Sequence, residues 1–334
     1  MSEHKKVKWG IIGLGNQGEK IAQTIGLSKN GQLAGVFCDS PKRTSEFSQK
    51  YRTVGFNCSE DFLKQSGAEA VFISSPNHQH AIHSIAALKA GKHVLCEKPM
   101  ALSSKEAQEI KEAIINSNRR QFGVGFHLRF HPVFLVAKER IESGVLGKIK
   151  LVQMHWSIGR AGEMDFPPLP SHQRWREKTK LSGGGSLMAR GVHLFDLAFF
   201  LLGQEAEKIF SLSDVKSKKQ IDQTTVGVAR FGKTLMVMAT SRLVPFAINH
   251  MTVYGSHGRL FMPEPFTYDG TGTLQITTAK RDTVKKFTKK FNLYLVEIEN
   301  FSRAILTSKA WSGASADDGI KSVKMAERWS GLKN

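Results

Sequence analysis

Residues 10–26 read GIIGLGNQGEKIAQTIG, and this stretch decides the fold of the first part of the chain. Apolar residues at 7–12 predict a short buried strand, and the apolar spacing after the glycines predicts a helix. Between them, Gly13, Gly15 and Gly18 form the pattern G-x-G-x-x-G. The first glycine permits a tight turn, the second lets the backbone approach a pyrophosphate, and the third lets helix and strand pack closely. The stretch therefore predicts a dinucleotide-binding turn.

A carboxylate stands where such a site needs one. Asp39 follows the next predicted strand, residues 33–37, and an acidic residue about 20 positions beyond the glycine pattern binds ribose hydroxyls. Asp39 favours NAD over NADP because a carboxylate repels a 2′-phosphate. Ser40, Lys42 and Arg43 lie directly downstream and could bind that phosphate, so NADP stays open as the alternative.

The chain up to residue 126 alternates strand-like and helix-like segments, which is the signature of a parallel α/β sheet. The predicted strands are residues 7–12, 33–37, 71–73, 93–96 and 122–126, and a clear helix covers 103–116. We therefore predict that residues 1–126 form a Rossmann domain with a doubly wound parallel sheet.

The pattern changes after residue 126 to that of an α+β domain with a mostly antiparallel sheet. The predicted strands are residues 149–156, 224–231, 235–239 and 250–254, and a helix covers 191–202. A later helix carries Leu295, Ile298, Phe301 and Ile305 on one face. We predict that residues 127–334 form the substrate domain, with a C-terminal segment that packs back on the first domain.

The loop after the strand at 71–73 contains Ser75, Pro76 and Asn77, and such loops line the ligand crevice of a doubly wound sheet. His80 follows and is interpreted as a cofactor or surface residue. It lies close in sequence to two further histidines, but no cysteine or carboxylate stands nearby to complete a metal site. We therefore predict no metal.

Glu97, Lys98 and Pro99 follow the strand at 93–96 and carry the most informative chemical signal in the chain. A proline pushes the residue before it out of helical conformations, so we expect Lys98 to be extended at the carboxyl edge of the sheet, beside the nicotinamide. In a partly desolvated cleft, an ammonium group can bind a substrate hydroxyl and stabilise a developing alkoxide. From spacing alone, a lysine in an ordinary turn remains the alternative.

The predicted cofactor residues share the carboxyl edge of this sheet. They are Gly13, Leu14, Gly15, Asn16, Gln17, Asp39, Ser75, Pro76, Asn77, His80, Glu97 and Lys98.

The chain is strongly basic, with 48 Lys and Arg against 29 Asp and Glu and a net charge of +19. Such a balance suits nucleic acid, an anionic membrane or an acidic substrate. The basic residues are spread along the chain, however, and the densest run, residues 280–290, pairs lysines between single apolar residues, as on an exposed sheet edge. No apolar run is long enough to span a membrane. We expect neither nucleic acid nor membrane as a partner.

The three cysteines, Cys38, Cys58 and Cys96, show no metal-binding spacing and cannot form a disulfide framework. They are predicted to be free thiols in a reducing cytoplasm.

These motifs together resemble the Gfo/Idh/MocA oxidoreductases, the glucose-fructose oxidoreductase and inositol dehydrogenase-like family. The similarity covers nearly the whole chain: SSPNHQHAIHSIAALKAGKHVLCEKPMA at residues 74–101, GVGFHLRFHP at 123–132, Trp175-Arg176, GGGSLMARGVHLFDLAFFLLG at 183–203 and SADDGIKSVKMAE at 315–327. It implies a Rossmann domain, then an α+β domain with a large open sheet that forms homodimer or homotetramer contacts. It also implies NAD or NADP, with sugars, sugar derivatives or cyclitols as substrates.

The resemblance assigns two catalytic positions, Lys98 and His193, the latter as the histidine of the second motif. The usual aspartate of that motif is replaced by Ala189, which is followed by Arg190. Three interpretations follow. His193 and Lys98 suffice, with Arg190 meeting an anionic substrate; or His127 or Asp196 replaces the lost carboxylate; or catalysis is attenuated. The family's aspartate at the position of Asp196 is better explained by helix structure.

The expected reaction is reversible hydride transfer at a carbinol carbon. Lys98 polarises the reacting oxygen, and His193 moves the proton because an imidazole titrates near neutrality. His127 and Arg190 are predicted to contact the substrate, and a long loop that carries Arg160, Trp175 and Arg176 is predicted to close over it. The arginines suggest a carboxylated or phosphorylated substrate. Two other functions remain open: a redox-neutral glycosidase that retains NAD, and a cofactor-sensing protein without catalysis.

Overall fold

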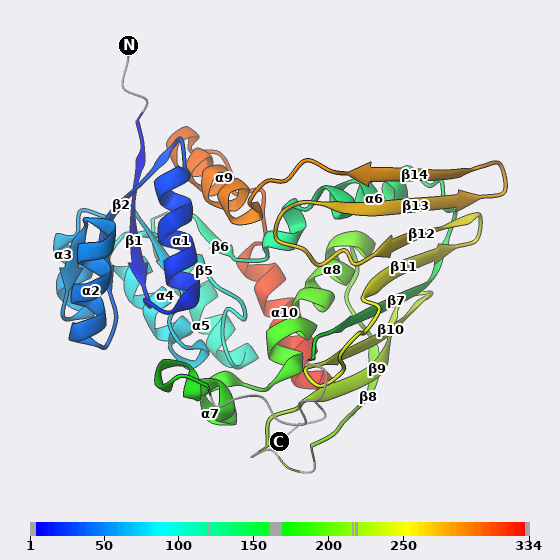
Figure 1. The fold of residues 1–334 in the computed structure, drawn as a ribbon, viewed down its shortest axis with the longest axis horizontal. Helices are drawn as coiled ribbons and strands as arrows, with labels where there is room; N and C mark the ends of the chain where they lie inside the picture. The colour runs from blue at the N-terminus through cyan, green and yellow to red at the C-terminus, as the bar shows by residue number, and fades with distance from the viewer. Residues whose placement is uncertain (1–4, 119, 160–168, 216, 218–219, 331–334) are drawn as a thin grey trace. The chain divides into compact units, whose positions relative to one another are not determined.

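The computed structural model describes residues 5–118, 120–159, 169–215, 217 and 220–330. The chain forms two compact units, which Figure 1 shows as ribbons. Unit 1 comprises Met1–His127 and Tyr294–Val323, and unit 2 comprises Leu128–Leu293 and Lys324–Asn334.

Unit 1 is built on a parallel sheet of six strands in the order β3-β2-β1-β4-β5-β6. The strands are β1 (Val7–Ile12), β2 (Gly31–Phe37), β3 (Val54–Phe56), β4 (Ala70–Ile73), β5 (His93–Cys96) and β6 (Phe122–Val124). The strand order reverses between β1 and β4, and in a doubly wound sheet ligands bind at the carboxyl ends of the strands at this switch point. The predicted Rossmann fold is confirmed.

Helices pack on both faces of this sheet (Figure 1). They are α1 (Asn16–Leu27), α2 (Pro41–Tyr51), α3 (Ser59–Gln65), η1 (Asn77–Gln79), α4 (His80–Lys89), α5 (Ser104–Ile115) and most of α9 (Leu293–Thr307). Trp9 of β1 is fully buried under α1 and α9. Its ring lies 5.6 Å from that of Phe301, and its Nε1 donates to Ser302 Oγ at 3.0 Å. A C-terminal helix thus completes the core of the N-terminal unit.

Unit 2 contains a sheet of eight strands in the order β14-β13-β12-β11-β7-β10-β9-β8. The strands are β7 (Ile149–Ser157), β8 (Lys208–Ser213), β9 (Thr224–Phe231), β10 (Thr234–Ser241), β11 (His250–Gly255), β12 (Gly258–Pro263), β13 (Gly272–Thr278) and β14 (Asp282–Phe287). Neighbouring strands are antiparallel except for β7 and β10, which are parallel. The predicted open, mostly antiparallel sheet is confirmed.

One face of this sheet is covered by helices of the same unit. The helical elements described in unit 2 are η2 (His127–Phe130, whose first residue belongs to unit 1), α6 (Pro132–Glu142), η3 (Ser171–Glu177), α7 (Thr179–Ser182), the π-helical turn η4 (Leu187–Gly191), α8 (Val192–Leu202) and the end of α10 (Ala316–Trp329). Buried methionines line the covered face: Met154, Met236, Met238, Met251 and Met262. Flexible thioether side chains fill the irregular space between helices and a pleated sheet.

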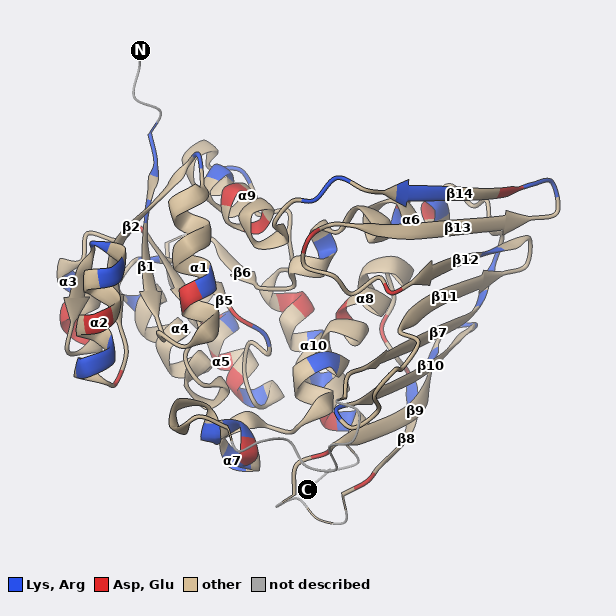
Figure 2. Cartoon of the chain, in the orientation of Figure 1, with Lys and Arg blue, Asp and Glu red and all other residues tan. Residues whose placement is uncertain are grey.

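The edge strand β14 explains the densest basic run. All but the last of its residues are exposed, and Figure 2 shows part of the strand in the colour of Lys and Arg. Charged side chains on an edge strand oppose pairing with another chain. The interpretation of this run as a solvated sheet edge is confirmed.

The stretch Thr179–Leu202, which contains α8, has the length and mean hydropathy of a membrane-spanning helix. However, 78% of its apolar window is buried inside the unit. A helix that is apolar on all sides is also what the core of a large domain requires, and α8 lies in that core.

Candidate functional site

The glycine turn in unit 1 has the shape of a phosphate cradle. Gly13 has φ +96°, and a Cβ there would lie 2.2 Å from Ser75 N; a Cβ on Gly18 would lie 2.1 Å from Gly13 O. A Cβ on Gly15 would instead meet nothing within 4 Å. Packing therefore requires glycine at positions 13 and 18, while Gly15 borders open space at the start of α1.

The first turn of α1 is free to bind an anion. Gly15 occupies the N-cap position, so no side chain there accepts a hydrogen bond from the first N–H groups. These N–H groups and the positive end of the helix dipole suit a pyrophosphate. Of the neighbouring residues, Asn16 and Gln17 form this turn, while the side chain of Leu14 is buried in the core and offers only its backbone. The residues present fit the diphosphate of a nicotinamide dinucleotide.

Asp39 lies just beyond β2 with an exposed side chain, as a ribose-binding carboxylate requires. Its Oδ2 accepts a hydrogen bond from Nε2 of Gln79 at 2.8 Å, which links the loop after β2 to η1. Ser40 Oγ accepts from Arg43 N at 3.4 Å and caps α2. Lys42 is exposed and lies 4.0 Å from Glu46. The hydroxyl of Ser40 is thus used by the helix, while the basic groups lie in the first turn of α2.

The loop after β4 is tied to the loop after β5 by a buried histidine. His80 Nε2 lies 2.8 Å from Ser75 O, and its Nδ1 lies 2.6 Å from Pro99 O. Burial lowers the pKa of His80 to about 4. A neutral imidazole has one N–H, so only one of these contacts is a hydrogen bond in the uncharged ring. Both ring nitrogens face backbone, which leaves His80 as a support for the cofactor loops.

The remaining predicted cofactor residues of these loops are Pro76 and Asn77, which start η1 at the carboxyl end of β4. Ser75 is buried, and its Oγ lies 2.9 Å from Nδ1 of His83 on α4. Ser75 and Pro76 therefore present backbone, and Asn77 presents a side chain, at the edge of the sheet where the glycine turn lies.

Glu97 and Lys98 extend this edge directly beyond β5. Glu97 is 7% exposed, and its Oε1 accepts from Gln17 Nε2 at 2.7 Å while its Oε2 accepts from the N–H of Lys98 at 3.1 Å. Burial raises the pKa of Glu97, and the charge of Lys98 opposes this rise. The Lys98-Pro99 bond is cis. Lys98 is half-buried and belongs to the same edge as the glycine turn.

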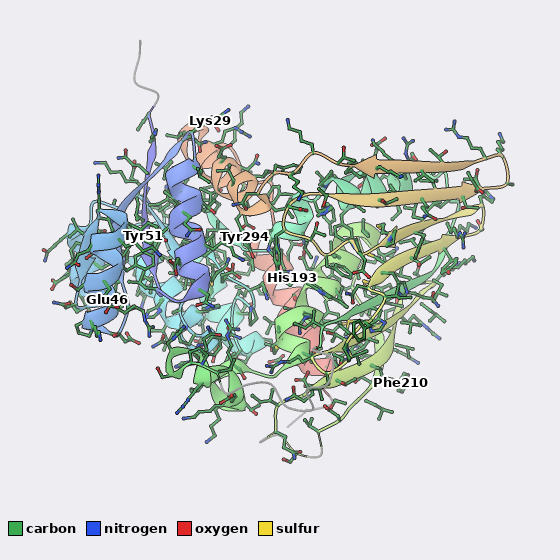
Figure 3. All side chains as sticks on the ribbon, in the orientation of Figure 1. Lys29, Glu46, Tyr51, His193, Phe210 and Tyr294 are labelled. Atoms are coloured by element: carbon green, nitrogen blue, oxygen red, sulfur yellow. The ribbon has the colours of Figure 1, made fainter. Side chains whose placement is uncertain are left out.

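An aromatic pair adds to this edge from a distant part of the sequence. Tyr294, at the start of α9, stacks on His127 with ring centroids 4.4 Å apart, and Lys20 of α1 lies 5.0 Å from the centre of the tyrosine ring. Figure 3 labels Tyr294 near α1. His127 is therefore part of unit 1, where the sequence suggested a substrate contact of the second domain.

Unit 2 contains the second motif, and backbone conformation or close packing explains each of its three glycines. Gly183 ends α7 with φ +79°, and Gly184 has φ +152°. A Cβ on Gly185 would lie 1.9 Å from Asp222 O. The carboxylate of Asp222 accepts from Gly185 N at 2.6 Å and from Leu187 N at 2.7 Å. Asp222 thereby holds the start of the π-helical turn, and such turns are frequent at functional sites.

His193 lies in the first turn of α8 and is 3% exposed (Figure 3). Its ring lies 5.6 Å from that of Trp156 on β7. Ala189 lies one turn earlier, within the π-helical turn. Asp196 is engaged by Arg129, whose Nε and Nη2 bind both carboxylate oxygens at 2.7–3.1 Å. Asp196 thus forms a buried ion pair that fixes α8 to η2.

The predicted substrate loop is described only in part. Arg160 lies outside the described residues. Trp175 and Arg176 lie on η3, with the guanidinium 4.5 Å from the indole ring. Arg190 lies in the π-helical turn and is half-buried beside Arg242. Burial and the charge of Arg242 lower the pKa of Arg190 to about 10, so it remains a cation at neutral pH. The described residues contain no group of three potential metal ligands.

Sequence reasoning missed four residues of these clusters: Gln79, Asp222, Arg242 and Tyr294. Gln79 carried a usable signal, because it lies on the loop after β4, where carboxyl-end residues converge. Asp222, Arg242 and Tyr294 had none, because each is brought to its partner by long-range packing.

Residues 7–126 match the model of an oxidoreductase family with an NAD-binding Rossmann fold, GFO_IDH_MocA, and residues 134–261 match the GFO/IDH/MocA C-terminal domain. The 1,5-anhydro-D-fructose reductase of Ensifer adhaerens is 24% identical over 95% of this chain and 93% of its own length. The myo-inositol 2-dehydrogenase of Thermotoga maritima is 25% identical over 93% and 91%.

A solved levoglucosan dehydrogenase in complex with NADH has the same fold. Its TM-score is 0.85 at 19% identity, covering 98% of this chain and 96% of its own. The two family matches together span most of the chain and include both motifs built above. The chain belongs to the Gfo/Idh/MocA family of nicotinamide-dependent oxidoreductases.

Proposed function

We propose that this protein transfers a hydride between nicotinamide and a CH–OH or C=O carbon of a sugar, sugar derivative or cyclitol, with Lys98 and His193 as its catalytic residues. One observation carries the proposal: the residue before Lys98 is hydrogen-bonded to the first turn of the phosphate-binding helix, through Gln17 and Glu97 at 2.7 Å. The hydrogen bond thereby connects the segment that carries Lys98 to the helix that we propose holds the cofactor diphosphate.

Bound nicotinamide supplies the hydride donor or acceptor; the chain supplies binding, orientation and proton transfer. Gly15 and the first N–H groups of α1 hold the diphosphate, and Asp39 holds the ribose hydroxyls. The ammonium of Lys98 donates a hydrogen bond to the reacting oxygen of the substrate and stabilises negative charge on it. The backbone N–H of Lys98 is fixed by Glu97, which limits the reach of the amine.

His193 takes the hydroxyl proton in the oxidation direction and returns it in the reduction direction. A nearly fully buried imidazole on a rigid helix, next to the indole of Trp156, is held in one orientation. Asp196 supports this geometry indirectly, because its pair with Arg129 anchors the helix. Ala189 stands where the family commonly carries an aspartate, and the indole of Trp156 packs against the histidine ring. Trp175 and Arg176 cover the substrate side in this proposal.

The cofactor is NAD in preference to NADP. Asp39 accepts from Gln79 and presents its carboxylate at the end of β2, where a 2′-phosphate would be repelled. The exposed Lys42 and the half-buried Arg43 offer less to a 2′-phosphate, since they lie beyond this carboxylate on α2.

The protein forms a homodimer or homotetramer through the uncovered face of its large sheet. Phe210 on β8 is 72% exposed and pairs with Val228 of β9, which in turn pairs with Val237 of β10; both valines are exposed as well. Phe210 lies on the side of the sheet away from α8 (Figure 3). An apolar face of this kind marks an interaction site. Light scattering of Phe210→Asp is expected to show dissociation; an unchanged mass excludes this face as the contact.

The binding partner in this proposal is a small, sugar-like substrate. The protein itself is assigned to the cytoplasm. The three cysteines are free thiols, which agrees with a reducing compartment.

The proposal is tested with a panel of polyols, cyclitols, sugars and sugar acids, with NAD and NADP in parallel, by the absorbance of the reduced cofactor. We expect turnover of at least one polyhydroxylated compound, faster with NAD. Cofactor that binds tightly and yields no reduced product with any compound, in either direction, would contradict the proposal.

A further inference from the structure

Arg190 is a half-buried cation whose charge is not balanced by a carboxylate in the described part of unit 2. Its Nη1 atom is buried and has no hydrogen-bond partner among the described residues. No carboxylate in the described ranges forms an ion pair with it. A buried guanidinium normally binds a carboxylate or phosphate through its fork of N–H groups, so the site lacks a complementary group.

Two acids, one bonded to the start of this turn and one on the helix that follows it, are committed elsewhere. Asp222 uses one oxygen for Gly185 N and the other for Leu187 N. Asp196 uses both oxygens for Arg129. Neither carboxylate can turn to Arg190 without losing these bonds.

A second cation adds to the positive charge. Ser186 Oγ lies 2.8 Å from Thr240 Oγ1, which holds the π-helical turn against the end of β10. Arg242 follows β10 directly, so this packing brings the two guanidinium groups to the same end of the turn. The charge of Arg242 lowers the pKa of Arg190, while Tyr268 raises it. The like charge of Arg242 raises the cost of keeping Arg190 charged in a partly desolvated region, and an anion beside Arg190 offsets that cost.

We propose that Arg190, supported by Arg242, binds an anionic group of the substrate, a carboxylate or a phosphate. This inference rests on the proposed function in one respect, that the anion belongs to the molecule on which His193 acts. The turn that carries Arg190 leads into the helix that carries His193, three residues later. A residue on that turn reaches a substituent near the reacting carbon, and Ala189 leaves space where the family commonly has a competing carboxylate.

The first test measures binding to the NADH complex by calorimetry. The probes are D-glucose, D-glucuronate and D-glucose 6-phosphate, which share a ring and differ in charge. We expect at least one charged probe to bind about tenfold more tightly than D-glucose, and Arg190→Gln to reduce this ratio about tenfold, or ~1.4 kcal/mol. Arg190→Lys keeps the charge and is expected to retain part of the preference. Arg281→Gln, an exposed arginine of the same unit, is the matched control.

The second test needs no sugar. Inorganic phosphate is expected to raise the Tm of the wild type and of Arg281→Gln, and to raise that of Arg190→Gln much less, because a ligand stabilises only the protein that binds it. Equal phosphate shifts in all three proteins, or an unchanged charged-to-neutral ratio in Arg190→Gln, would overturn the inference. Preference for one charged probe alone identifies the anion.

The two proposals fail separately. If neutral sugars are turned over and the charge preference does not depend on Arg190, the anion site is rejected and the oxidoreductase activity is retained. If anion binding depends on Arg190 but no compound exchanges a hydride with the cofactor, the proposed reaction is rejected and the anion site is retained.

Discussion

Gln17 donates its Nε2 to Oε1 of Glu97 across 2.7 Å, joining the start of α1 to the end of β5. Glu97 is buried and also accepts the backbone N–H of Lys98. One carboxylate therefore links α1, which we propose binds the diphosphate, to the residue that we assign to the reaction. Substitution of Glu97 therefore removes this support and leaves the amine of Lys98 in place.

Glu97→Ala is predicted to lower kcat by about tenfold or more, because it removes the acceptor of two partly buried donors and no longer fixes the backbone of Lys98. Glu97→Gln keeps an acceptor oxygen and should recover part of the rate. Steady-state kinetics measures both variants. A rise in KM alone, with kcat unchanged, would show that Glu97 supports binding and does not position Lys98.

Lys98→Met is predicted to reduce turnover by roughly 10²–10⁴-fold, the usual contribution of a group that acts on the proton or charge of the reacting oxygen. NADH affinity, followed by fluorescence, should change little. If the variant turns over normally, Lys98 is not at the reaction centre.

The glycine turn allows a matched pair of substitutions. Gly15→Val adds atoms to open space and is predicted to leave the Tm unchanged while weakening NADH binding about tenfold, equivalent to ~1.4 kcal/mol. Gly18→Ala would push a Cβ against Gly13 O and is predicted to lower the free energy of unfolding by about 1–3 kcal/mol. Thermal denaturation and NADH titration of both variants check this. Unchanged NADH affinity in Gly15→Val would argue that no phosphate lies against this residue.

Asp39→Ala is predicted to shift cofactor selectivity toward NADP by about tenfold in the ratio of kcat/KM values, or ~1.4 kcal/mol. It removes the acceptor of the ribose hydroxyls and the repulsion of a 2′-phosphate. Glu60→Gln, an exposed charge loss on α3, is the control. Equal selectivity in the wild type, the control and Asp39→Ala would remove Asp39 from the cofactor site.

Unit 2 is predicted to lose stability in acid through His131. Its Nδ1 accepts from Val133 N at 3.2 Å and caps α6, and burial lowers its pKa to about 4. Because the folded pKa lies below the unfolded value, this contribution is complete above pH ~6.5 and is lost as pH falls toward 4, by about 2 kcal/mol. Urea unfolding between pH 7.5 and 4.5 measures it. His131→Asn keeps a capping side chain and should show a weaker pH dependence; an equal slope would assign the effect to other groups.

Local patterns predicted the fold where they matched a single element. The strands at β1, β5 and β9 were predicted with their observed bounds, since each is a mostly apolar or alternating run. No strand was predicted at β3, β8, β12 or β13. β3 has only three residues and β8 is largely exposed, and the pairing of all four comes from neighbouring strands. On α9, Ile298 and Phe301 are buried as expected, but Tyr294 replaces Leu295 on the inward face.

The candidate site was predictable where its residues form local motifs, as the fold was. Glycine spacing, Asp39 and the residues before Pro99 carry local chemical signals, and they lie together at one edge of one sheet. The links Gln79–Asp39 and Asp222–Gly185 join residues 40 and 37 positions apart. Such contacts depend on packing that no local pattern encodes.

The central claim is that the amine of Lys98 contacts the oxygen that gains or loses hydrogen. A crystal structure of the complex with NADH and a substrate from the panel tests it directly. The account predicts Nζ within roughly 2.6–3.2 Å of that oxygen. An amine turned into solvent, with another side chain on the reacting oxygen, would contradict it.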